Sequence, residues 1–195
     1  PYTTLFRSAA EPHRIDLLRQ VPFTAIHAGC LALPWVGTST TAVMVALVLY
    51  VVRMFAITAF YHRYFSHRAF RTSRAVQFIF ALVGASSAQR GPLWWPSHHR
   101  HHHVHSDRVE DSHSAMHHGL LWSHLGWFMS RGNFAPRTGF VSSFSKFPEL
   151  RFLDRWDSLA PALLCGLLAL SGSLAQRHAP SLHTSAAQLV VWGFC

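Results

Sequence analysis

The sequence predicts an all-α integral membrane protein, made of two transmembrane hairpins and a histidine-rich helical region on the cytoplasmic side. Of its 195 residues, 50% are hydrophobic and 13% are charged, which is about half the charged fraction of an ordinary soluble domain. The apolar residues gather in long runs, and most of the 16 histidines lie between these runs. This composition argues against a disordered chain and against a nucleic-acid-binding protein, although the net charge is +9.

Two apolar runs near the N-terminus predict the first hairpin. Residues 21–37 are short for a span, and residues 42–60 are interrupted mainly by Arg53 and Thr58. The turn between the runs carries no charge, whereas arginines cluster outside them, at Arg7, Arg14, Arg19, Arg63, Arg68, Arg71 and Arg74. Because positive residues favour the cytoplasmic side, we expect the N-terminus and the end of the second run to lie there.

The rest of the chain predicts one short segment, one polar region and a second hairpin. Residues 75–95 begin as an apolar run that small and polar residues soon break, which favours a re-entrant or interfacial helix over a span. Residues 97–155 are polar and rich in histidine and tryptophan, as expected of a cytoplasmic region against the bilayer. Residues 159–174 and the run from Ala187 predict the second hairpin. We therefore expect four spans, with the last one truncated at Cys195.

The histidines form two clusters beside the short segment. His62 and His67 are five residues apart, which on an ideal α-helix places them about 140° from each other. Both can face one site only if the helix bends or ends between them. His99, His102 and His103 have offsets that put them on one helical face. Since neutral imidazole is a common ligand of iron, zinc and copper, the two clusters together predict a metal site.

Further histidines follow, interleaved with acidic residues. They are His105, His113, His117, His118 and His124, beside Asp107, Glu110 and Asp111. A metal-bound imidazole usually donates its other N–H to a carboxylate or a carbonyl. We therefore expect some of these residues to orient metal ligands and the others to be ordinary surface histidines.

Three motifs in a fixed order carry a resemblance to a known family. H-R-Y-F-S-H at 62–67, H-R-H-H-H at 99–103 and S-H-L-G-W at 123–127 closely resemble the membrane-bound fatty acid desaturases, specifically the acyl-CoA Δ9 group. The resemblance implies that residues 9–195 form a fatty acid desaturase domain. This domain would be incomplete, because the family's third histidine box, of the form H-x2-H-H, is absent. Residues 1–8 match nothing that follows, and we interpret them as a non-native leader.

The resemblance also implies an activity and a set of site residues. Members of the family use two iron ions, O2 and two electrons to introduce a cis double bond into a saturated acyl chain, here expected to be an acyl-CoA. Carried over by position, the iron ligands would be His62, His67, His99, His102 and His103. Trp95 would line the acyl site, and Arg131 would contact the CoA phosphates. The electron donor would be a cytochrome b5, a ferredoxin or a flavoprotein reductase, and the chain alone is expected to be inactive.

Two other functions remain open. A membrane hydroxylase of alkanes or lipids shares the histidine-box chemistry, but the S-H-L-G-W motif favours a desaturase. A zinc-handling membrane protein with a histidine-rich loop is the other alternative. Transporters usually place polar ligands inside the spans, whereas these spans hold few besides His27 and Arg53.

Overall fold

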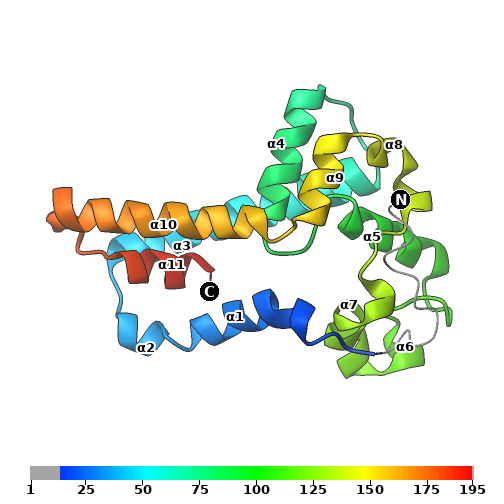
Figure 1. The fold of residues 1–195 in the computed structure, drawn as a ribbon, viewed down its shortest axis with the longest axis horizontal. Helices are drawn as coiled ribbons and strands as arrows, with labels where there is room; N and C mark the ends of the chain where they lie inside the picture. The colour runs from blue at the N-terminus through cyan, green and yellow to red at the C-terminus, as the bar shows by residue number, and fades with distance from the viewer. Residues whose placement is uncertain (1–13, 195) are drawn as a thin grey trace.

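The computed structural model describes residues 14–194, and this part of the chain folds entirely into helices and turns (Figure 1). Its only strand-like pairing is an isolated bridge between Ile15 and Ser130. The all-α prediction is confirmed for these residues. The leader interpretation for residues 1–8 falls outside the described residues.

Long apolar helices extend from one end of the molecule (Figure 1). Helix α3 (Thr40–Phe55) continues directly into a π-helical segment, Ala56–Ser66, and α10 (Leu159–His178) is the other long helix. The two continuous helices contain 27 and 20 residues, and an 18-residue stretch of each has a mean hydropathy of 2.3 and 1.6, respectively. Both are long and apolar enough to cross a membrane. Large apolar side chains along them are exposed, as lipid contact requires: Leu47, Val48, Val51, Leu163, Leu167 and Leu170.

The other two predicted spans are shorter in the structure. The first apolar run is divided into α1 (Val21–Cys30) and α2 (Leu33–Val36). Pro34 explains the break, because it has no N–H to donate to the carbonyl of Cys30 and so cannot extend α1. The last run forms α11 (Ala186–Phe194), with nine residues. Two of the four predicted spans thus have the length of a span, and the four-span topology and its orientation stay predictions.

Helix α11 joins the apolar helices together, since it packs against α10, α3, α1 and α2. Gly172 of α10 allows a close approach of the two backbones, because a Cβ there would lie 2.6 Å from Ala186 Cα. The side chains of Gln188 and Trp192 donate hydrogen bonds to the carbonyls of Val36 and Gly37, both at 3.0 Å. These contacts fix the end of α2 against α11.

A second group of helices packs around the π-helical segment at the other end of the molecule. Helix α4 (Arg74–Ala85) is the short apolar segment that the sequence predicts as re-entrant or interfacial, and α5 (Trp94–His105) and α9 (Pro148–Arg155) accompany it. Their shared core contains Tyr61, Tyr64, Phe65, Ala81, Leu93, Val141, Phe144, Leu150 and Leu153. The ring of Tyr61 packs on Gly84, where a Cβ would lie 2.1 Å from Tyr61 Cε1. The core therefore holds α4 and α5 against the π-helical segment.

Short helices complete the histidine-rich region. They are α6 (Ala115–His118), a π-helical turn at Trp122–Gly126, α7 (Trp127–Met129) and α8 (Ser142–Ser145). Single 3-10 turns occur at Leu18–Gln20, Arg131–Asn133, Thr138–Val141 and Pro180–Leu182.

Candidate metal centre

The π-helical segment brings the first two histidines together. The backbone N–H of His67 donates to the carbonyl of His62 at 3.0 Å, which is the i to i−5 bond of a π-helix. Residues five apart therefore lie on the same side of the helix, and the Nε2 atoms of His62 and His67 are 3.2 Å apart. Instead of the bend or helix end that the spacing predicts, the helix widens, with the same result for the two side chains.

Helix α5 supplies the second pair. His99 and His103 are one α-helical turn apart, and their Nε2 atoms approach to 3.0 Å. The helix begins against a partly buried carboxylate, because Asp154 Oδ1 accepts hydrogen bonds from the backbone N–H groups of Leu93 at 2.9 Å and Trp94 at 2.7 Å. Asp154 satisfies two of the donors that a helix start leaves unpaired, and so fixes where α5 begins.

The two pairs converge on one point. The ring centroids of His62 and His99 are 4.7 Å apart, and those of His67 and His103 are 5.0 Å apart. One nitrogen from each ring lies within 4.8 Å of the others. For nitrogen ligands at about 2.1 Å from a metal, the edge of a tetrahedron is about 3.4 Å, so four nitrogens this close suit a single ion. We refer to these four histidines as the four-histidine centre.

The protonation of the centre also suits a metal. Burial, followed by the neighbouring imidazoles, lowers the pKa of His99 to about 3. The same causes lower the pKa of His67 from its ordinary value. Both rings are therefore neutral near pH 7, and only a neutral imidazole offers a lone pair to a metal.

Arg100 fastens the two pairs to each other. It lies on α5 between the paired histidines, and its guanidinium donates hydrogen bonds to the carbonyls of Phe65 at 2.8 Å and Ser66 at 2.5 Å. These carbonyls end the π-helical segment, one or two residues before His67. A third bond reaches the carbonyl of Phe140. Arg100 thus sets the position of His67 relative to the histidines of α5.

His102 does not join the other four predicted ligands. Its ring centroid lies 5.8 Å from that of His103, and its Nδ1 lies 2.9 Å from a carboxylate oxygen of Asp111. His102, Asp111 and His113 form a second group whose ligand atoms lie within 4.8 Å of one another. The sequence places His102 on the same helical face as His99 and His103, but the structure turns its side chain to this second group. Its role as a metal ligand stays a prediction.

The two predicted substrate residues lie in different places. Trp95 stacks on His99, with ring centroids 4.8 Å apart, and its Nε1–H donates to Gln89 Oε1 at 3.3 Å. It is therefore part of the wall of the four-histidine centre. Arg131 is paired with the N-terminal segment instead, since its Nε lies 3.2 Å from Asp16 Oδ2. Its side chain is 50% exposed.

Two neighbouring histidines of α5 lie outside the four-histidine centre. His98 is buried, with its Nε2 3.2 Å from the carbonyl of Ala135 and its Nδ1 3.4 Å from Arg137 Nε. His101 is buried against Phe140. Neither belongs to the four-histidine centre.

Sequence reasoning did not identify Arg100 or Asp154. Arg100 stands between predicted metal ligands, where a cation is unfavourable unless its charge is engaged elsewhere, and this was an available signal. Asp154 is more than 50 residues away in the sequence from the helix that it caps, and no pattern connects the two.

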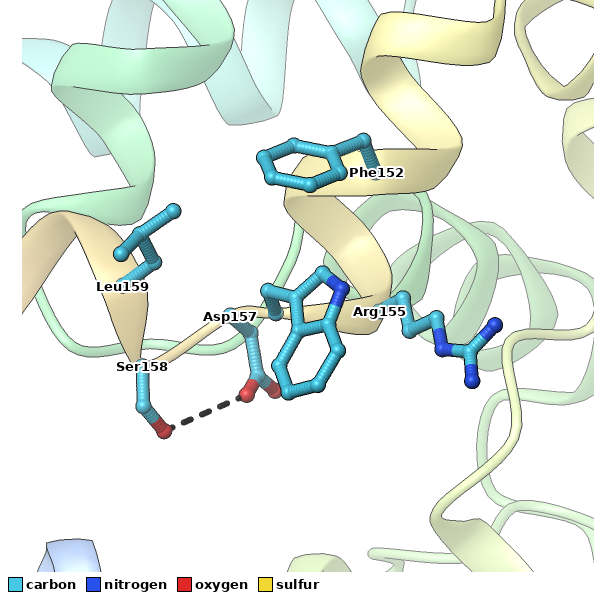
Figure 2. A pocket seen from close by; sticks show the side chains of 6 residues that line it. Phe152, Arg155, Asp157, Ser158 and Leu159 are labelled. Atoms are coloured by element: carbon cyan, nitrogen blue, oxygen red, sulfur yellow. Dashed lines mark hydrogen bonds between the residues drawn. The ribbon is translucent and has the colours of Figure 1, made fainter.

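A separate hollow of about 590 Å³ lies where α9 meets α10 (Figure 2). It is lined by Phe152, Arg155, Trp156, Asp157, Ser158 and Leu159. Aromatic and charged residues at the start of a candidate span are typical of anchoring at the membrane surface. None of the lining residues belongs to the four-histidine centre, so the hollow is a separate feature.

Comparison with known proteins gives a consistent set of relatives. The family model described as fatty acid desaturase matches residues 38–195. An acyl-CoA 5-desaturase of Anemone leveillei is 31% identical over 183 residues, which are 92% of this chain and 55% of the relative. An sn-1 stearoyl-lipid 9-desaturase of Anabaena variabilis is 33% identical over 146 residues, which are 73% of this chain and 53% of the relative. A probable acyl-CoA desaturase of Schizosaccharomyces pombe is 29% identical over 163 residues, which are 78% of this chain and 33% of the relative. The chain spans about half the length, or less, of these relatives.

Proposed function

Because the chain belongs to the fatty acid desaturase family, we propose that it supplies the four-histidine centre of an enzyme that introduces a cis double bond into a saturated acyl-CoA. The observation that carries this proposal is the convergence of His62, His67, His99 and His103 from two distant segments. Each pair lies at the end of the molecule away from the exposed apolar stretches of α3 and α10, as expected of a site at the membrane surface.

Iron is the metal that the proposal assigns to this centre. The four imidazole nitrogens would hold one iron ion, and His102 would be a ligand of a second. Removing hydrogen from an unactivated methylene requires an oxidant that no side chain offers, and bound iron with O2 would supply it. The protein's own residues have the task of holding the acyl chain beside that point.

The overall reaction balances with one O2 and two external electrons. The acyl chain loses two hydrogen atoms, which carry two electrons and two protons. A donor of the cytochrome b5, ferredoxin or flavoprotein reductase type supplies two more electrons, and two protons come from solvent. O2 takes all four electrons and four protons and becomes two water molecules.

Trp95 would form part of the acyl site. Its indole covers one face of His99, and the hydrogen bond to Gln89 holds the ring in that orientation. A rigid apolar wall beside the metal excludes water and positions one carbon–carbon bond of the chain. Arg131 would bind the CoA phosphates through its half-exposed guanidinium.

The names of the relatives support desaturation. They differ in the molecule that carries the acyl chain, which is either CoA or a lipid. They include an acyl-CoA 5-desaturase and a stearoyl-lipid 9-desaturase. We assign an acyl-CoA and the Δ9 position to this chain on the motifs of its sequence. The protein would be a multi-pass membrane protein whose histidine boxes and N-terminus face the cytoplasm.

Because the chain alone is expected to be inactive, the test uses cells that express it joined to a segment that carries the missing third histidine box, and it measures their fatty acid profile. Gas chromatography with mass spectrometry should show a new cis-unsaturated fatty acid, absent with His99→Ala and retained with His178→Ala, an exposed histidine at the end of α10. A hydroxylated fatty acid as the product would support the membrane hydroxylase alternative instead. No modified acyl chain, with wild-type levels of protein, would refute the proposed function.

A further inference from the structure

We infer that Asp111 is a positioning residue for metal binding: its buried carboxylate holds His102 in the tautomer that leaves Nε2 free for a metal ion. This inference rests on the proposed function in one respect, the assignment of His102 as a ligand. The contacts of Asp111 themselves do not depend on that function.

The hydrogen bond between the two residues fixes the tautomer. Asp111 Oδ2 lies 2.9 Å from His102 Nδ1. An ionised carboxylate only accepts hydrogen bonds, so Nδ1 must carry the proton and donate it. A neutral imidazole has one N–H, and Nε2 therefore keeps its lone pair. This arrangement of carboxylate, histidine and metal is common where a protein orients a ligand imidazole.

The burial of Asp111 argues that the contact is built for a purpose. Its side chain is 1% exposed, and a buried carboxylate costs several kcal/mol unless it is paired and hydrogen-bonded. Oδ1 accepts a bond of 3.4 Å from the backbone N–H of His113, a local turn contact that an asparagine would also make. The second oxygen, Oδ2, lies against His102 Nδ1, and the turn contact does not require this hydrogen bond.

The surroundings hold His102 in place from a second side. The ring of His113 stacks on that of His102, with centroids 4.2 Å apart and planes 29° apart. The ring of Trp127 packs against His113 with a centroid distance of 4.8 Å. The backbone N–H of Ser114 donates to the carbonyl of Asp111 at 3.1 Å. The imidazole of His102 is thus clamped between a carboxylate and an aromatic stack.

If the same residues bound a metal directly, the expected protonation of His102 Nδ1 would be the opposite. His102, Asp111 and His113 would bind a metal directly if His102 Nδ1 and a carboxylate oxygen were both ligands. In that case Nδ1 carries no proton when metal is bound. The protonated nitrogen of His102 therefore distinguishes a positioning carboxylate from a three-residue metal site.

The experiment is nitrogen NMR of the full chain in lipid nanodiscs, labelled with 15N-histidine and free of metal. Two-bond correlations between ring protons and nitrogens identify the tautomer, and the His102 signals are assigned with His102→Gln. We expect His102 as the Nδ1–H tautomer, before and after addition of zinc as the probe metal. An Nε2–H tautomer, or loss of the Nδ1 proton when zinc binds, would overturn the inference.

Variants separate this role from general stability. Asp111→Ala should shift His102 toward the Nε2–H tautomer, whereas Asp111→Asn, which keeps an acceptor oxygen, should retain Nδ1–H. The exposed neighbour Glu110 provides the matched control, and Glu110→Gln should change nothing. Zinc affinity at the four-histidine centre should stay within twofold in Asp111→Ala. An unchanged tautomer in Asp111→Ala, or loss of zinc at the four-histidine centre, would refute a positioning role.

Because the first readout uses wild-type protein without metal or substrate, it is independent of the desaturase assignment. An acyl product without the Nδ1–H tautomer would refute only this inference. The tautomer without any acyl product from the chain joined to a third histidine box would refute only the proposed function.

Discussion

Replacement of Arg100 by methionine should weaken metal binding although Arg100 binds no metal. The substitution keeps an unbranched apolar stem in place of the arginine methylenes and removes the guanidinium. Three backbone carbonyls lose their donor, those of Phe65, Ser66 and Phe140. Two of them end the π-helical segment that carries His62 and precedes His67.

The expected size follows from the number of bonds. A hydrogen bond to a charged group contributes about 1.5 to 3 kcal/mol. Because Arg100 is only partly buried, we take the low end of this range, which gives about 4.5 kcal/mol for the three bonds. For a chain of this size that corresponds to a fall of about 9 to 18 °C in Tm. Loss of the group that orients His67 should also reduce metal affinity 10- to 100-fold, on the order seen when residues that orient metal ligands are removed.

The assay is zinc competition against a chromophoric chelator, together with thermal unfolding of the same detergent-solubilised samples. Arg100→Lys should retain part of both properties, because an ammonium is a compact point charge and lacks the planar fork that serves several carbonyls at once. Arg71, an exposed arginine, provides the control, and Arg71→Met should behave as wild type. Wild-type affinity and Tm in Arg100→Met would refute the claim that Arg100 fastens the two histidine pairs.

Three further predictions concern the supports of the site and the fold. Burial raises the pKa of Asp154 from 3.8 to about 6, so the folded chain holds this proton more tightly than the unfolded chain. The free energy of unfolding should therefore fall by about 3 kcal/mol between pH values of about 4 and 6; Asp154→Asn should lose this slope, and an unchanged slope would contradict the prediction. Gly172→Ala should lower Tm by pushing α10 and α11 apart, whereas Gly166→Ala, on the same helix with nothing within 4 Å, should not; equal effects would contradict a close helix approach. Trp95→Leu should raise KM for the acyl substrate without changing iron content, and steady-state kinetics with an unchanged KM would exclude Trp95 from the acyl site.

The features that the sequence predicts well are those that depend on composition and spacing. The all-helical fold and the two long apolar helices follow from runs that only helices can satisfy in lipid. The meeting of the two histidine pairs follows from their positions at the borders of such runs. Pro34 was a visible signal for the break in the first run, and an analysis by hydropathy alone passes over it.

The remaining features depend on contacts that a linear pattern does not contain. Whether residues 56–66 form an α-helix or a π-helix is decided by which carbonyl each N–H reaches, and the last two of its carbonyls are bound by Arg100 from another helix. The offset of three residues predicts a shared face for His99 and His102. The buried carboxylate of Asp111, which comes from a loop, turns His102 away from that face.

The most direct test of the central claim is the iron content of the purified chain after anaerobic loading with Fe(II) and removal of unbound metal. The four-histidine centre predicts one tightly bound iron ion per chain. Alanine at His62, His67, His99 or His103 should abolish this binding, and His178→Ala should preserve it. Iron that survives the loss of His99, or a chain that binds only zinc under the same conditions, would contradict an iron centre built on these four histidines.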